Sequence, residues 1–253
     1  MVVSARQIIA GNWKMHKTLR EGLDLTQGIL EGLRTIPPHR SVLVFPPATL
    51  LHPISQRIGD RNLDLGAQDL SWERQGAFTG EISPLQLLDA GCSCVLVGHS
   101  ERRHVIKESE DRIRLKLKSA LENGLRAILC IGETLEEREA GKTGDILTTQ
   151  LASALETMKE PPNSGFLTVA YEPVWAIGTG KTATPEQAQE AHAAIRSLLI
   201  GRWGDPGGEI QILYGGSVKP ENAGELLSLE DVDGVLVGGA SLEAASFLGI
   251  ARA

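Results

Sequence analysis

The sequence predicts an α/β protein in which eight parallel strands, alternating with helices, form a single (β/α)8 TIM barrel. Short apolar segments rich in β-formers recur along the chain, and segments with helical periodicity lie between them. The apolar segments are nearly continuous rather than alternating, which is typical of parallel strands covered on both faces. No shift in composition and no linker divides residues 1–253, so we expect one domain.

The expected strands follow one another along the whole chain. They are Gln7–Ala10, Ser41–Phe45, Leu63–Ala67, Cys94–Val97, Ala127–Ile131, Thr168–Tyr171, Gln211–Tyr214 and Gly234–Val237. An open doubly wound sheet is the alternative architecture. It normally carries a glycine-rich dinucleotide fingerprint after its first strand, and the residues that follow the first strand here, Gly11 to Lys14, lack that pattern.

Helices are expected in the intervals between the strands. Thr18–Leu33 and Arg112–Leu125 both have helical apolar periodicity, and the second carries its charges on the opposite face. Capping boxes begin at Ser83, Thr134 and Thr184, and two of the three have proline at the first helical position. Eight strands that alternate with helices over about 250 residues match the number of elements and the length typical of a (β/α)8 barrel.

The composition is ordinary for a globular protein of the cytoplasm and is compatible with a small anionic substrate. The net charge of −7 disfavours nucleic acid as a partner, because a phosphate backbone selects clustered lysine and arginine. No apolar run approaches the roughly 18 residues of a membrane span, and no signal peptide is recognisable. Cys92, Cys94 and Cys130 are expected to be reduced, buried thiols. Cys92 and Cys94 are also a conceivable metal pair, but no second cluster completes it.

Residues able to do chemistry follow five of the expected strands. In this architecture the active site forms at the C-terminal ends of the strands. Each group alone has a structural alternative: a solvated lysine, a structural histidine, a salt-bridged helix start or a tight glycine turn. Their convergence on one rim favours a catalytic site with a phosphate anchor and no metal. The residues are Asn12, Lys14, His99, Ser100, Glu101, Glu172, Gly215, Gly216, Ser217, Gly238 and Gly239.

The segment after the sixth strand predicts a base beneath a lid. Pro173 biases Glu172 toward an extended backbone, which keeps its carboxylate at the strand end. Gly178 and Gly180 leave backbone N–H groups open to an anion. An ordinary strand-to-helix loop that holds a glutamate is the alternative. The lid is expected to comprise Pro173, Val174, Trp175, Ala176, Ile177, Gly178, Thr179, Gly180, Lys181, Thr182 and Ala183.

A long connection, residues 69–82, separates the third strand from the next helix. Loops of this length without secondary structure are usually functional. This loop carries Trp72 and Phe78, which a protruding segment has to bury somewhere, so a partner subunit is the expected receptor.

Five motifs occur in order along the chain: Gly11–Met15, Gly98–Arg103, Tyr171–Ala183, Tyr214–Val218 and Gly234–Gly239. Together they resemble the triosephosphate isomerase family, and the likeness runs from about Arg6 to Ile250. One such motif is weak evidence, but five in register are specific. The resemblance implies a homodimeric, cofactor-free isomerase of glycolysis and gluconeogenesis. Its reaction would interconvert dihydroxyacetone phosphate and D-glyceraldehyde 3-phosphate through an enediolate.

The resemblance also implies catalytic roles, in a family that is itself a standard example of tuned catalytic groups and of loop closure. Glu172 is the base that moves a proton between C1 and C2. His99, neutral at a helix N-terminus, polarises the carbonyl. Lys14 supplies positive charge, Asn12 positions Lys14 and the substrate oxygen, and Glu101 is a supporting carboxylate.

The phosphate and the dimer contact follow from the same resemblance. The phosphate is expected near Asn12 and Lys14 and on the N–H groups of Gly178, Ser217, Gly238 and Gly239. Thr79, in the 69–82 loop, is expected beside Lys14 of the partner subunit. Asp69 departs from the family pattern, which usually has asparagine there.

Two alternative functions remain open from the sequence. A non-catalytic phosphosugar-binding barrel would have no need of Glu172, His99 and Lys14 together. An isomerase of a larger phosphosugar needs room that a lid carrying Trp175 and Ile177 denies.

Overall fold

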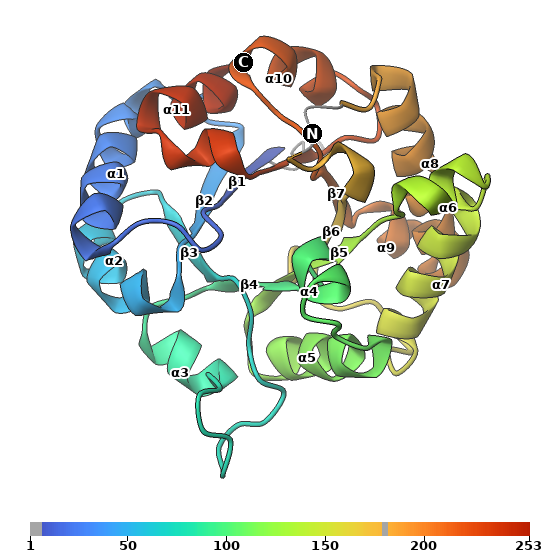
Figure 1. The fold of residues 1–253 in the computed structure, drawn as a ribbon, viewed down its shortest axis with the longest axis horizontal. Coiled ribbons are helices and arrows are strands. Elements are labelled where there is room, and N and C mark those ends of the chain that lie inside the picture. The colour runs from blue at the N-terminus through green and yellow to red at the C-terminus, as the bar shows by residue number, and fades with distance from the viewer. Residues whose placement is uncertain (1–6, 179–181) are drawn as a thin grey trace.

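The computed structural model describes residues 7–178 and 182–253, and in them parallel strands close into a barrel surrounded by helices (Figure 1). Each strand pairs with the next one along the chain, and β8 pairs with β1. The predicted fold class is confirmed, and every predicted strand lies within two residues of its expected bounds. The strands are β1 Gln7–Asn12, β2 Arg40–Phe45, β3 Asp64–Ala67, β4 Cys94–Val97, β5 Arg126–Ile131, β6 Leu167–Tyr171, β7 Gln211–Tyr214 and β8 Gly234–Val237.

Helices follow the strands and cover the outside of the barrel (Figure 1). Short 3₁₀ turns lie at Leu33–Thr35 (η1), Ala48–Leu50 (η2), Val174–Ala176 (η3) and Gly239–Leu242 (η4). The α-helices are α1 Leu19–Gly32, α2 Leu51–Ile58, α3 Pro84–Asp89, α4 Ser100–His104, α5 Glu110–Glu122, α6 Leu135–Glu139, α7 Thr143–Leu155, α8 Pro185–Trp203, α9 Asp205–Gly208, α10 Pro220–Leu227 and α11 Ala244–Arg252.

The helix start signals in the sequence are correct. Reciprocal capping boxes are formed at Ser83, Thr134 and Thr184, where α3, α6 and α8 begin. Helix α5 begins two residues earlier than the expected Arg112, because the hydroxyl of Ser109 caps it by accepting the Arg112 N–H.

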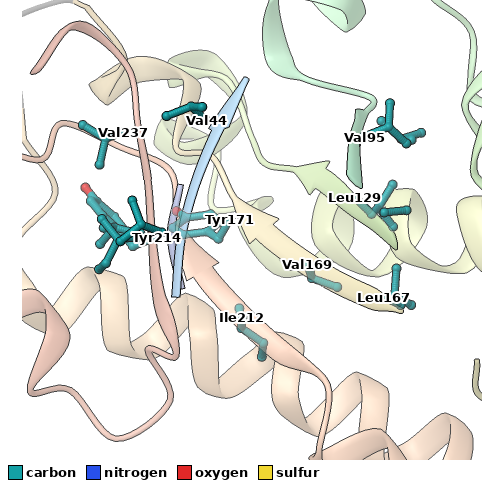
Figure 2. Packing of buried hydrophobic residues seen from close by; sticks show 14 of the residues in the cluster. Val44, Val95, Leu129, Leu167, Val169, Tyr171, Ile212, Tyr214 and Val237 are labelled. Carbon is teal, nitrogen blue, oxygen red and sulfur yellow. The ribbon is translucent and has the colours of Figure 1, made fainter. Parts of the chain in front are cut away.

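Side chains of the strands alternate between two hydrophobic layers. One set fills the interior of the barrel, and the other packs outward against the helices, because successive side chains on a strand point to opposite faces. Figure 2 shows part of the outer layer, including Val169, Tyr171, Ile212 and Tyr214 on the neighbouring strands β6 and β7. The inner layer consists of Ile8, Ala10, Leu43, Phe45, Cys94, Leu96, Ile128, Cys130, Ala170, Leu213 and Leu236.

The thiols of Cys92, Cys94 and Cys130 are free and buried, as predicted. Burial raises the pKa of Cys94 to about 12, so the thiol stays protonated and packs as a small apolar group. No helix in the described parts of the chain is long and apolar enough to cross a membrane.

One charge on α5 lies where the sequence does not predict it. The periodicity of Arg112–Leu125 puts its charges on the face opposite the apolar one, yet Lys116 is only 2% exposed. Its ammonium contacts Asp69 at 2.7 Å and Glu108 at 2.5 Å, and Arg102 joins the same carboxylates at 3.1 Å each. Burial raises the pKa of Asp69, and the two cations only partly offset that effect. A buried ammonium is tolerated here because two carboxylates compensate its charge.

Candidate active site

A cavity of about 630 Å³ opens at the C-terminal ends of the strands. Side chains along a strand alternate between the two faces, and this explains the lining of the cavity. Ala10, Ala170 and Leu236 belong to the inner layer, so Asn12, Glu172 and Gly238, two positions later, also face inward. The predicted residues that line it are Asn12, Lys14, His99, Glu172, Ile177, Gly178, Gly215, Gly216, Ser217, Gly238 and Gly239.

The carboxylate of Glu172 is held at the floor of this cavity. Its backbone N–H donates to the Ile131 carbonyl at 2.7 Å, which continues the β5–β6 pairing by one residue. One carboxylate oxygen accepts the Ser100 N–H at 2.7 Å, and the other lies 3.0 Å from His99 Nε2. A methyl group on Gly215 would lie 2.8 Å from Glu172 Cγ, so only glycine leaves room for this side chain.

The surroundings of Glu172 favour its charged form. Burial alone would raise the pKa of the carboxyl, since the side chain is 3% exposed. The facing His99 ring and the Ser100 N–H, which opens helix α4, more than offset burial and lower the pKa. The group is therefore an anion held by two donors.

The His99 ring is oriented by the helix that it caps. Its Nδ1 accepts the Glu101 N–H at 3.2 Å, which requires a lone pair on Nδ1 and a proton on Nε2. Burial lowers the pKa of His99, but the Glu172 carboxylate and, less strongly, Glu101 raise it above the usual value. When Glu172 moves away, the main raising contribution disappears, and the Glu101 N–H then favours a neutral ring that donates through Nε2.

Lys14 is fixed through its backbone as well as its side chain. Its φ of 51° is left-handed, a conformation that costs a non-glycine residue about 1–2 kcal/mol. The Asn12 side-chain oxygen accepts its N–H at 2.9 Å, and Gln68 donates to its carbonyl at 2.8 Å. Its ammonium lies 2.7 Å from a Glu101 carboxylate oxygen. The cation is thus directed into the cavity between β1 and α4.

Another part of the cavity wall presents backbone N–H groups. Ser217 lies on the turn between β7 and α10, and its N–H donates to no other atom in the described part of the chain. Gly239 begins η4, so its N–H has no intrahelical acceptor. A methyl group on Gly216 would lie 2.2 Å from the Tyr214 hydroxyl oxygen, which explains the glycine before Ser217. The wall has the chemistry of an anion site.

The first part of the predicted lid is held by a buried glutamate. Glu133 accepts hydrogen bonds from Trp175 Nε1 at 2.9 Å and from the Tyr171 hydroxyl at 3.1 Å. Arg138 lies 3.1 Å from the same oxygen and 4.9 Å from the centre of the Trp175 ring. Three predicted lid residues, Thr179, Gly180 and Lys181, lie outside the described residues.

Two residues that shape the site were not anticipated as such. Gln68 directly follows β3, so the strand-end rule that selected the other candidates could have found it. Glu133 lies two residues beyond β5, and its partner Trp175 is 42 positions away, so no local spacing signals the pair. Thr79, by contrast, does not line this cavity and is exposed on the 69–82 loop.

Comparisons with known proteins agree with this geometry. Residues 7–253 match the family model described as triosephosphate isomerase. The chain is 51% identical to a triosephosphate isomerase of Nitratidesulfovibrio vulgaris strain DP4, over 96% of this chain and 97% of that protein. It is 49% identical to a Chloroflexus aurantiacus protein of the same name, with the same coverage. A crystal structure of triosephosphate isomerase from Bartonella henselae superposes with a TM-score of 0.88 at 43% identity, covering 97% of both chains.

Proposed function

The chain belongs to the triosephosphate isomerase family and interconverts dihydroxyacetone phosphate and D-glyceraldehyde 3-phosphate, and we propose that Glu172 is the base of this reaction. The observation that carries the proposal is the 3.0 Å contact between a buried, anionic Glu172 and His99 Nε2. A base and a proton donor thus face each other at the floor of one cavity.

The proposed reaction begins when the substrate displaces Glu172 from Ser100 and His99. The freed carboxylate takes a proton from the carbon next to the carbonyl, and negative charge develops on the carbonyl oxygen. His99 Nε2–H and the Lys14 ammonium stabilise that charge, because donors fixed in advance need no reorganisation as it forms. Asn12 supports this by holding the Lys14 backbone. Glu101 supports it by orienting both His99 and Lys14.

The phosphate of the substrate is proposed to bind the wall formed by the Ser217 turn and the start of η4, where Gly238 lies beside the Lys14 side chain. The N–H groups of Ser217, Gly238 and Gly239 would hold the dianion, and Gly178 would add another when the lid closes. Ile177 would then cover Glu172 and exclude water, which makes the base stronger and suppresses phosphate elimination from the enediolate. The Trp175–Glu133 bond would have to break or shift during closure.

A coupled assay tests the substrate class. The purified chain should isomerise the two triose phosphates and show little turnover of C4 to C6 sugar phosphates. If a larger phosphosugar is turned over more efficiently, the substrate assignment fails. If inorganic phosphate binds but no sugar phosphate is turned over, the chain is a binding protein.

We further propose that the enzyme is a cytoplasmic homodimer. A second cavity of about 790 Å³ lies on the other side of Lys14 and His99 and is bordered by exposed apolar side chains. Among them Met15 is 95% exposed, and Val105 and Ile106 are 73% and 61% exposed. The 69–82 loop protrudes from the barrel between β3 and α3 (Figure 1). The Thr79 tip of a partner subunit is the proposed occupant of this cavity.

Size-exclusion chromatography with light scattering tests the dimer. The expected mass is twice that of the 27.1 kDa chain. Ile106→Asp should shift it toward the monomer, whereas Ile200→Asp, on the 44% exposed Ile200 of α8, should not. A monomeric parent would contradict the proposal.

A further inference from the structure

Asn222, in the first turn of α10, links the helix to the turn that carries Ser217. Its side-chain oxygen accepts the Lys219 N–H at 2.8 Å, and its side-chain N–H donates to the Ser217 carbonyl at 3.1 Å. One amide thereby satisfies two backbone groups of the turn, one donor and one acceptor. Neither bond is made by the backbone ladder of the helix.

The turn has few other fixed points. Residues 215–219 connect β7 to α10, and Gly215 is held by its N–H bond to the Tyr171 carbonyl at 2.7 Å. Val218 is 5% exposed and packs into the outer core. Ser217 lies between these anchors, half-buried, and its carbonyl is bound only by Asn222 among the residues that the structure describes.

The other half of the phosphate wall has its own support. The fully buried Ser241 hydroxyl donates to the Gly238 carbonyl at 2.7 Å, which holds the start of η4. The two halves are therefore positioned independently. A change at Asn222 should disturb Ser217 and leave Gly238 and Gly239 in place.

We propose that Asn222 is a positioning residue for phosphate binding. By fixing the Ser217 carbonyl and the Lys219 N–H, it sets the backbone angles on either side of Val218. The Ser217 N–H is then aimed into the cavity before the substrate arrives. This inference rests on the proposed assignment of the phosphate to Ser217, and Asn222 itself does not line the cavity. Preorganised donors bind more tightly, since the ligand does not have to order them.

Two substitutions separate the lost hydrogen bond from other effects. Asn222→Asp keeps the shape and the acceptor for Lys219 but cannot donate to Ser217. An acidic residue also suits the first turn of a helix, so the fold should be retained. Asn222→Ala removes both bonds without adding charge. Asn62→Asp is the matched control, because exposed Asn62 precedes β3 at the opposite end of the barrel.

The measurements are kcat and KM for triose phosphate and the inhibition constant of inorganic phosphate, at low and high salt. In both Asn222 variants, KM and the inhibition constant of inorganic phosphate should be about three- to tenfold higher than in the parent. This is the range expected for the loss of one hydrogen bond. The rise in both constants should persist at high salt, and kcat should stay within about twofold of the parent value. Asn62→Asp should leave all three unchanged.

Three outcomes would overturn the inference. The first is an unchanged phosphate constant in both Asn222 variants. The second is a rise in the aspartate variant alone that vanishes at high salt, which would mean that the added charge acts. The third is a fall in kcat and stability with no change in phosphate binding, which would mean a purely structural role. If the parent binds inorganic phosphate but does not isomerise triose phosphates, the proposed function fails. The phosphate binding constants of the parent and the Asn222 variants still decide the role of Asn222.

Discussion

His192 should make the fold less stable in mild acid. It lies on α8 and is fully buried between Tyr171 and Tyr214, with ring centres 5.9 and 6.3 Å away. Its Nδ1 contacts the Asp231 carbonyl at 3.1 Å, so Nδ1 carries the proton. Its Nε2 has no partner among the described residues. A protonated ring would place an unpaired N–H and a charge in this aromatic layer.

The size of the effect follows from the pKa. Burial lowers the pKa of His192 from 6.5 to about 4. The unfolded chain therefore takes up a proton that the folded chain refuses as the pH falls from 6.5 to 4. A difference of 6.5 − 4, about 2.5 pH units at about 1.4 kcal/mol each, gives a loss of roughly 3 kcal/mol below pH 4. Well above pH 6.5 the residue contributes no pH dependence.

Urea unfolding at about pH 7.5 and about pH 4.5, at one fixed protein concentration, measures this loss. Other groups also titrate in this range, so the parent is compared with His192→Asn, whose amide can still donate to the Asp231 carbonyl. The unfolding free energy of the parent should fall by about 2–3 kcal/mol more than that of the variant. His52→Asn, at an exposed histidine on α2, is the control. Equal losses in parent and His192→Asn would refute the reasoning.

Two further substitutions test the geometry around Glu172, the proposed base. Gly215→Ala places a methyl group 2.8 Å from Glu172 Cγ and should lower kcat by about 10²-fold, whereas Gly144→Ala, with open space around it, should leave kcat unchanged. Equal kcat values for the two variants would contradict the crowding argument. Glu133→Gln removes the charge that holds Trp175 and should lower the free energy of unfolding by about 1–3 kcal/mol in urea titrations. An unshifted urea midpoint would show that this anchor is not stabilising.

The sequence predicts the barrel well because its signals are local. Each strand is a short, continuous apolar segment. Helices α3, α6 and α8 begin at capping boxes, each of which is a motif of four consecutive residues. The placement of Asn12 and Glu172 at the rim follows equally simply, from strand ends and the two-residue alternation. These features need no knowledge of what lies across the barrel.

The features that sequence reasoning missed depend on partners far apart in the chain. Lys116 is buried because Asp69 and Glu108, from separate segments, meet at its ammonium. Glu133 can bind Trp175 of the predicted lid only when β5 and β6 bring the two residues together. No spacing rule encodes such pairs, since Lys116, Asp69, Glu108 and Glu133 each resemble an ordinary surface charge when the partner is unknown.

The role of Glu172 is tested most directly by the isomerisation rate of Glu172→Gln. The substitution keeps the shape of the side chain and removes its ability to accept a proton from carbon. The kcat of the variant should be about 10² to 10⁴ times lower than that of the parent, and the inhibition constant of inorganic phosphate should be nearly unchanged. A variant that isomerises triose phosphates as fast as the parent would contradict the assignment of Glu172 as the base.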